Sequence, residues 1–67
     1  GEVLKQGSRG RAVSILQNRL NHHGAKLAVD GDFGKKTHQA VLLFQKSRGL
    51  KDDGIVGKIT WAALFKN

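Results

Sequence analysis

The sequence predicts an all-α fold, a small three-helix module built from short repeated turn-helix units. The first observation is a repeated phrase: residues 30–37 read DGDFGKKT and residues 53–60 read DGIVGKIT. An Asp-Gly turn, an apolar residue, a second Gly and then a Lys that opens an apolar run are typical of a turn followed by a helix start. The second observation is that residues 12–17 (AVSILQ) match residues 40–45 (AVLLFQ). Together the two repeats indicate one structural unit that recurs along the chain, with its last copy incomplete.

Residues 9–23 are predicted to form the first helix. Ser8 carries a hydroxyl suited to cap the free N–H groups at a helix start, and Gly24 is expected just beyond the last turn. The apolar residues of this segment recur at helical spacing and form one stripe, which comprises Ala12, Val13, Leu16 and Leu20. We expect this stripe to face the core.

Residues 35–48 are predicted to form the second helix. Gly34 precedes it, and its apolar residues share one face, which comprises Ala40, Val41 and Phe44. Gly49 is expected to stop the helix, with Leu50 folding back in a Schellman ending.

A third, shorter helix is predicted to begin after Gly57. Its apolar residues are Trp61, Leu64 and Phe65. A helix of this length is not stable alone in water, so it depends on docking. Short loops at residues 25–33 and 51–56 connect the helices, with an extended residue or two expected at residues 27–29.

The chain length allows one domain, residues 1–67, with a small core. A domain of this size buries about 60% of its unfolded surface and has a stability of roughly 3 to 10 kcal/mol. The chain contains no Cys, so neither a disulfide nor a thiolate metal site can hold it. No apolar run approaches the roughly 18 residues of a membrane span, and no leader is recognised. Because the chain lacks an initiator Met, we interpret it as an excised piece or a processed product.

The charge is strongly positive, with 12 Lys and Arg against 5 acids and a net charge of +7. Four of the acids lie in the two turns, where they are expected to accept backbone hydrogen bonds: Asp30, Asp32, Asp52 and Asp53. The remaining surface is therefore almost purely basic, which predicts attraction to polyanions. Nucleic acid, anionic lipid and anionic cell-wall polymers all qualify.

The residue types of the chain and their spacing give little support for a catalytic site or a metal site. Glu2 is the only glutamate, so a glycosidase pair would have to come from aspartates held in turns. The serines lie at a predicted cap or on helix surfaces without a nucleophile motif: Ser8, Ser14 and Ser47. Adjacent His22 and His23 diverge by about 100° around a helix and cannot share one metal ion. A calcium loop from Asp30 would need a closing Glu where Val41 stands. We predict no catalytic residue, no metal and no cofactor.

The turn residues are predicted to be structural. The carboxylates of Asp30 and Asp53 are expected to accept hydrogen bonds from amides around residues 33–34 and 56–57. The other turn positions are glycines, expected to supply positive φ or a helix start: Gly31, Gly34, Gly54 and Gly57.

Gln17 and Gln45 each end an apolar stripe and leave two interpretations open. Either amide could hydrogen-bond a loop backbone internally, or it could present its donor and acceptor to a peptide ligand. Phe33 and Val56 are expected to fill the core from the turns.

This arrangement resembles the peptidoglycan-binding domain type 1 family. The residues that carry the resemblance are Leu4, Gly7, Ser8, Arg9, Gly10, Val13, Leu16, Gln17, Leu20, Val29, Asp30, Gly31, Phe33, Gly34, Thr37, Ala40, Val41, Phe44, Gln45, Gly49, Leu50, Asp53, Gly54, Val56, Gly57, Thr60, Trp61 and Leu64. Lys35 and Lys58 stand where the family often has Pro at a helix start, and Arg11 stands where an acidic residue is usual. The resemblance implies a three-helix module appended to cell-wall hydrolases, including phage endolysins, amidases and zinc carboxypeptidases.

The resemblance supplies the ligand class, and helical geometry suggests the contacts. Lys35 and Lys58 combine a positive side chain with a helix start, which suits a carboxylate such as those of a muropeptide stem. They are the preferred polar contacts.

Five further candidates are drawn from the helices. His38 and Gln39 are expected to line a shallow groove, with Asn18 and His22 opposite them on the first helix. Trp61 either seals the third helix or offers a flat apolar surface to a sugar ring.

The function predicted from the sequence is a non-catalytic peptidoglycan-binding module that targets a hydrolase to the bacterial wall. Its expected partners are a glycan strand or stem peptide and a fused catalytic domain, with no membrane. Its expected location is the wall, the periplasm or the exterior, including a phage-encoded protein made in the host cytoplasm. The alternative is a small basic helical nucleic-acid-binding domain. That alternative is disfavoured, because the basic residues do not cluster on one predicted face and a short helix-turn-helix connection is absent.

Overall fold

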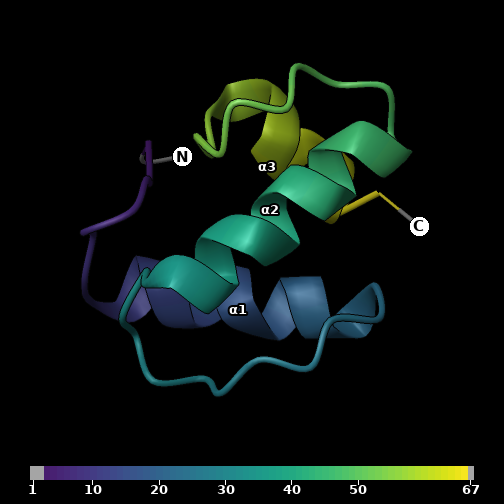
Figure 1. The fold of residues 1–67 in the computed structure, drawn as a ribbon. Coiled ribbons are helices and arrows are strands. Elements are labelled where there is room, and N and C mark those ends of the chain that lie inside the picture. Colours follow the sequence, from purple (N-terminus) through teal and green to yellow (C-terminus); the bar gives the residue numbers. More distant parts are fainter. Residues whose placement is uncertain (1–2, 67) are drawn as a thin grey trace.

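The computed structural model describes residues 3–66, which form three helices. They are α1 (Arg11–His22), α2 (Lys35–Ser47) and α3 (Lys58–Leu64). The loop after α1 runs back along that helix, so α1 and α2 begin at the same end of the molecule and α3 packs at the other (Figure 1). The all-α prediction is confirmed. Within residues 3–66, no helix is long and apolar enough to cross a bilayer.

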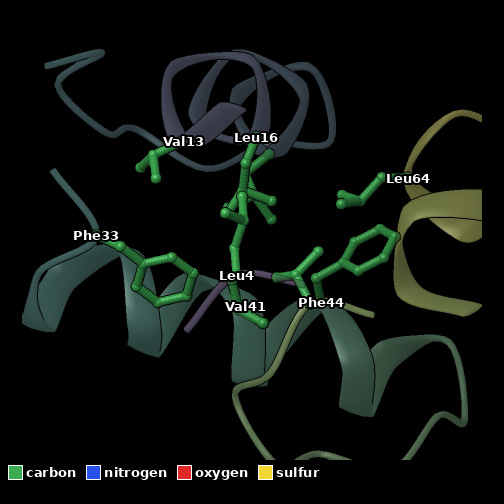
Figure 2. Close-up of a cluster of buried hydrophobic side chains, with 9 residues drawn as sticks. Leu4, Val13, Leu16, Phe33, Val41, Phe44 and Leu64 are labelled. Atoms are coloured by element: carbon green, nitrogen blue, oxygen red, sulfur yellow. The ribbon is translucent and has the colours of Figure 1, made fainter. Parts of the chain in front are cut away.

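The core draws side chains from every helix, from both repeated turns and from the segment before α1 (Figure 2). Its buried apolar residues are Leu4, Val13, Leu16, Leu20, Phe33, Val41, Phe44, Val56 and Leu64. Phe33 and Val56 fill the core from the turns, as predicted. Full burial of one such side chain contributes about 1.5 to 3 kcal/mol.

The helix ends follow the predicted glycines. Gly24 and Gly49 have φ of 106° and 69°, the left-handed region in which glycine is favoured. Beyond α2, the N–H of Leu50 donates to the carbonyl of Gln45 at 2.8 Å, and the equivalent bond closes α1. The ending of α2 is the predicted Schellman motif, and α1 ends in the same way.

The start of α1 differs from the prediction. The helix begins at Arg11 with Gly10 as its N-cap, so a start at residue 9 and a cap at Ser8 were both wrong. The Ser8 hydroxyl instead accepts a hydrogen bond from the Lys5 N–H at 3.1 Å, and the Ser8 carbonyl accepts one from the Phe33 N–H at 2.9 Å. Because its hydroxyl bonds to a turn and its carbonyl bonds to a distant loop, Ser8 does not cap the helix.

Backbone hydrogen bonds connect the segment before α1 to both repeated turns. Leu4 and Val56 exchange backbone hydrogen bonds of 3.0 and 2.8 Å, and the Gly10 N–H donates to the Gly31 carbonyl at 2.9 Å. The sequence predicted an extended residue or two at 27–29. The β-bridges among the described residues lie elsewhere and join Leu4 to Val56 and Arg9 to Asp32.

Residues 27–29 form no bridge in the described structure, and Leu27 makes its backbone hydrogen bonds to a side chain of α1. The Asn21 amide donates to the Leu27 carbonyl at 2.9 Å and accepts from its N–H at 2.7 Å. The Asn21 side chain thus makes the hydrogen bonds to Leu27 that a neighbouring strand would otherwise make.

Candidate functional site

A buried glutamine holds the first repeated turn from the core side. Gln17, 1% exposed, accepts hydrogen bonds through Oε1 from the N–H groups of Asp30 and Gly31, both at 3.0 Å. Its Nε2 donates to the Asp30 carboxylate at 3.0 Å, and to the Asp32 carbonyl and the Thr37 hydroxyl at 3.1 Å each. The amide is therefore saturated by the turn.

Gln45 does the same for the second turn. Its Oε1 accepts from the Gly54 N–H at 3.0 Å, and its Nε2 donates to the Ile55 carbonyl at 2.9 Å, the Thr60 hydroxyl at 3.1 Å and the Asp53 carboxylate at 3.3 Å. Both glutamines thus bond a loop internally, which settles the question that the sequence left open. We name residues 30–37 with Gln17 the first turn unit, and residues 53–60 with Gln45 the second turn unit.

The aspartates that begin the two units also stabilise the turns. The carboxylate of Asp30 accepts from the Asp32 N–H at 3.0 Å, and that of Asp53 accepts from the Ile55 N–H at 2.9 Å. The expected donors around residues 33–34 and 56–57 were wrong, because each carboxylate closes a tighter turn onto the amide two residues ahead. Gly31 and Gly54 have φ of 74°, as predicted.

Hydrogen bonds to these carboxylates lower their pKa. The Gln17 amide and then the Asp32 N–H lower the pKa of Asp30 below its ordinary 3.8. The Ile55 N–H has the largest effect on Asp53 and lowers its pKa in the same way; desolvation opposes it, and the Gln45 amide adds a smaller lowering effect.

We expect an Asp30→Asn, Asp53→Asn variant to lose less stability in acid than the parent chain. A carboxylate whose pKa is lower in the folded state stabilises the fold above its unfolded pKa, and that contribution disappears as the pH falls through the folded pKa. Urea midpoints measured from pH 6 to pH 2 should fall more steeply for the parent below about pH 4. Asp52→Asn, in an exposed loop position, should follow the parent. Identical acid limbs for the parent and the double variant would contradict the assignment.

The two turn units each border a hollow on the surface. The first-turn hollow has a volume of about 230 Å³, and Asp30, Asp32, Lys35 and Lys36 lie around it above Gln17 and Thr37. The second-turn hollow has a volume of about 520 Å³, and its lining includes Leu50, Lys51, Asp53, Ile55, Lys58 and Ile59. The repeat therefore produces equivalent sites with different surfaces.

A further hollow of about 320 Å³ lies between α1 and α2. Arg48 donates to His23 Nδ1 at 3.1 Å, and His23 Nε2 lies 2.6 Å from the Leu64 carbonyl. Because arginine only donates and a carbonyl only accepts, His23 carries its proton on Nε2. Arg19 donates to the same carbonyl at 2.6 Å. These polar groups join the end of α3 to α1 and α2.

The predicted ligand residues do not converge on one groove. Lys35 lines the first-turn hollow, whereas Lys58 lines the second. His38 is half-buried against the second turn, where a Cβ on Gly54 would overlap its ring. Trp61 is half-buried and packs on the core beside Phe65.

The other three candidates, Asn18, His22 and Gln39, are exposed and line none of these three hollows. Ile55 and Ile59, which line the second-turn hollow with Lys58, were not among the residues singled out from the sequence. A comparison of the two copies of the repeated phrase could have found them, because polar residues occupy the matching positions of the first copy.

Among residues 3–66, no three His, Cys, Asp or Glu side chains gather where they could hold a metal ion. The buried polar groups of the two turn units bond one another.

The comparisons with known proteins agree with this architecture. Residues 9–64 match the family model described as "Putative peptidoglycan binding domain". The chain is 44% identical to a zinc D-Ala-D-Ala carboxypeptidase of Streptomyces albus G, over 96% of this chain and 26% of that protein. It superposes on the endolysin of Burkholderia phage AP3 with a TM-score of 0.94 and 44% identity, covering 96% of this chain and 25% of that one.

A third similar structure is close to this chain in size. The SleB N-terminal domain has a TM-score of 0.91 and 39% identity, with 94% of this chain and 88% of that chain covered. By contrast, the chain spans only about a quarter of the carboxypeptidase and of the endolysin. The family match extends over most of the chain and includes both turn units, so the chain belongs to the peptidoglycan-binding domain type 1 family.

Proposed function

We propose that this domain is a non-catalytic module that holds a cell-wall hydrolase on peptidoglycan. The observation that carries the proposal is the family match over residues 9–64. It is supported by similarity to an amidase of Bacillus licheniformis, to the carboxypeptidase and to the endolysin, each much longer than this chain. A catalytic domain in the same polypeptide is the expected partner.

The mechanism that we propose is adsorption. The net charge of +7 attracts the domain to an anionic wall, and a short-range site then adds contacts that salt does not screen. Attachment through a linker raises the effective concentration of a fused hydrolase at its substrate. The location would be the bacterial wall, the periplasm or the exterior, and a phage-encoded origin fits as well. Either a glycan strand or a stem peptide could supply the short-range contacts.

We expect the isolated domain to sediment with purified peptidoglycan sacculi and to release no soluble muropeptides. Duplex DNA at matched salt serves as the comparison for a generic polycation. Protein that stays in the supernatant with walls of several chemistries would contradict wall binding. New reducing ends or soluble muropeptides from a clean preparation would contradict the non-catalytic assignment.

Measuring sacculus binding at low and high salt separates the diffuse electrostatic attraction from the short-range contacts. Raising the salt from about 0.05 to 0.5 M shortens the screening length from roughly 14 to 4 Å, so the diffuse attraction should vanish while a specific fraction remains bound. Lys26→Gln with Lys46→Gln, two exposed positions that line none of the three hollows, should weaken only the salt-sensitive part. Complete loss of binding by the parent at high salt would show that the domain adsorbs as a diffuse polycation.

A further inference from the structure

We propose that the second-turn hollow is the site that binds a peptidoglycan stem peptide, and that the equivalent first-turn hollow does not bind it. This inference rests on the proposed wall-binding function. It assigns a ligand class to one of two sites that the internal repeat makes directly comparable.

The two turn units have the same internal structure. In each, a buried glutamine bonds the turn backbone, the leading aspartate and a buried threonine hydroxyl with nearly equal distances. The hydrogen bonds centred on the glutamine are therefore the same in both copies. They do not account for the differences at the outer positions of the units.

Those outer positions differ in a consistent direction. Ile55 and Ile59 occupy the positions held by Asp32 and Lys36 in the first unit. Their side chains are 41% and 71% exposed. Since a polar pair serves the first turn equally well, the fold does not need exposed isoleucines here. Both side chains line the second-turn hollow and give it an apolar surface where the first-turn hollow has Asp32 and Lys36.

The surroundings of the isoleucines fit a ligand that is both apolar and anionic. Lys51 and Lys58 line the second-turn hollow together with one acid, Asp53. The first-turn hollow instead sets two lysines against two aspartates. A free carboxylate is therefore attracted to the second hollow more strongly than to the first.

A stem peptide has this chemistry, because it carries free carboxylates and the small methyl groups of alanine. The methyl groups would contact Ile55 and Ile59 while a carboxylate pairs with Lys58. A sugar ring is served best by a flat aromatic surface, and the residues lining this hollow include no aromatic ring. The volume of about 520 Å³ falls within the range of small-ligand sites, roughly 300 to 1,000 Å³, and the first-turn hollow at about 230 Å³ does not.

The repeat also supplies the test. The variant Ile55→Asp, Ile59→Lys places the residues of the first unit on the second turn and leaves the net charge unchanged. The reverse change, Asp32→Ile with Lys36→Ile, is the matched control and is also neutral in net charge. Thermal melting of both variants checks that they fold.

The probes are stem peptides freed from purified peptidoglycan by an amidase, and glycan strands stripped of peptide. We expect the Ile55→Asp, Ile59→Lys variant to bind the stem peptide roughly tenfold more weakly or worse, and to lose the salt-resistant part of sacculus binding. The control variant should retain both. Amide shifts of the parent on addition of stem peptide should centre on residues 49–60.

The possible failures are distinguishable. In one outcome, the parent sediments with sacculi, but the parent and the Ile55→Asp, Ile59→Lys variant bind the stem peptide with the same affinity. The assignment of this hollow is then wrong, while wall binding stands. The isoleucines would in that case be a protein-contact surface. If stripped glycan strands bind at residues 49–60 and stem peptides do not, the ligand class is wrong. If the parent does not sediment with sacculi, the proposed function itself fails.

Discussion

Replacing Gln45 with leucine is expected to leave the domain largely unfolded at 25 °C. The side chain is 1% exposed, and its amide bonds the Gly54 N–H, the Ile55 carbonyl and the Thr60 hydroxyl. Leucine fills a similar volume but leaves the buried Gly54 N–H and Thr60 hydroxyl and the partly buried Ile55 carbonyl without this partner. Each such group costs about 1 to 3 kcal/mol, so the loss of three partners is roughly 3 to 9 kcal/mol. That is comparable to the whole stability of a domain of this size.

Gln17→Leu should have an effect of the same size, because Gln17 makes the equivalent bonds in the first turn unit. Urea unfolding followed by circular dichroism measures both losses. Gln39→Leu, at an exposed position of α2, is the matched control and should change stability little. A loss below about 1 kcal/mol for both buried variants would show that the turns do not depend on these amides.

Removing residues 1–8 is expected to destroy the cooperative fold, although the family match begins only at residue 9. Leu4 is 3% exposed and projects into the same cluster as Leu16 and Val41 (Figure 2). The truncation also removes both Leu4–Val56 hydrogen bonds and the bonds that Gly7 and Ser8 make to Phe33. Both turn units would therefore lose backbone partners at once.

A single substitution isolates the packing contribution of this segment. Leu4→Ala should cost about 2 to 5 kcal/mol, the usual loss for a buried leucine. Val3→Ala is the control, since the Val3 side chain is 63% exposed and its loss should be small. Limited proteolysis and thermal melting of the truncated chain test the larger claim. A cooperative melt for residues 9–67 near that of the full chain would show that the segment is dispensable.

Features that depend on near neighbours in the chain could be predicted from the sequence. Apolar spacing located the three helices, because residues three and four apart share a helix face wherever the helix packs. Gly24 and Gly49 located two helix ends, because the left-handed conformation is costly for other residues. The repeated phrase also identified Phe33 and Val56 as core residues and predicted positive φ at Gly31 and Gly54.

The cap at Ser8 shows where such reasoning stops. A serine hydroxyl is suited to cap a helix or to close a turn, and its sequence neighbours do not choose between the two. In the structure the hydroxyl closes a turn onto the Lys5 N–H, while the Ser8 backbone pairs with Phe33, which is distant in the sequence. The helix therefore starts later than its sequence pattern suggests.

Only the tertiary structure decided which polar groups are used inside the fold and which remain at its surface. The amides of Gln17 and Gln45 suited a loop or a peptide equally well until the folded chain brought each turn onto them. Lys35 and Lys58 have matching positions in the repeat, yet the fold places them at separate hollows. The sequence by itself determined the helices, the turns and the family, because those follow from local geometry and spacing. The partners of polar side chains depend on contacts between distant segments, which form only when the core closes.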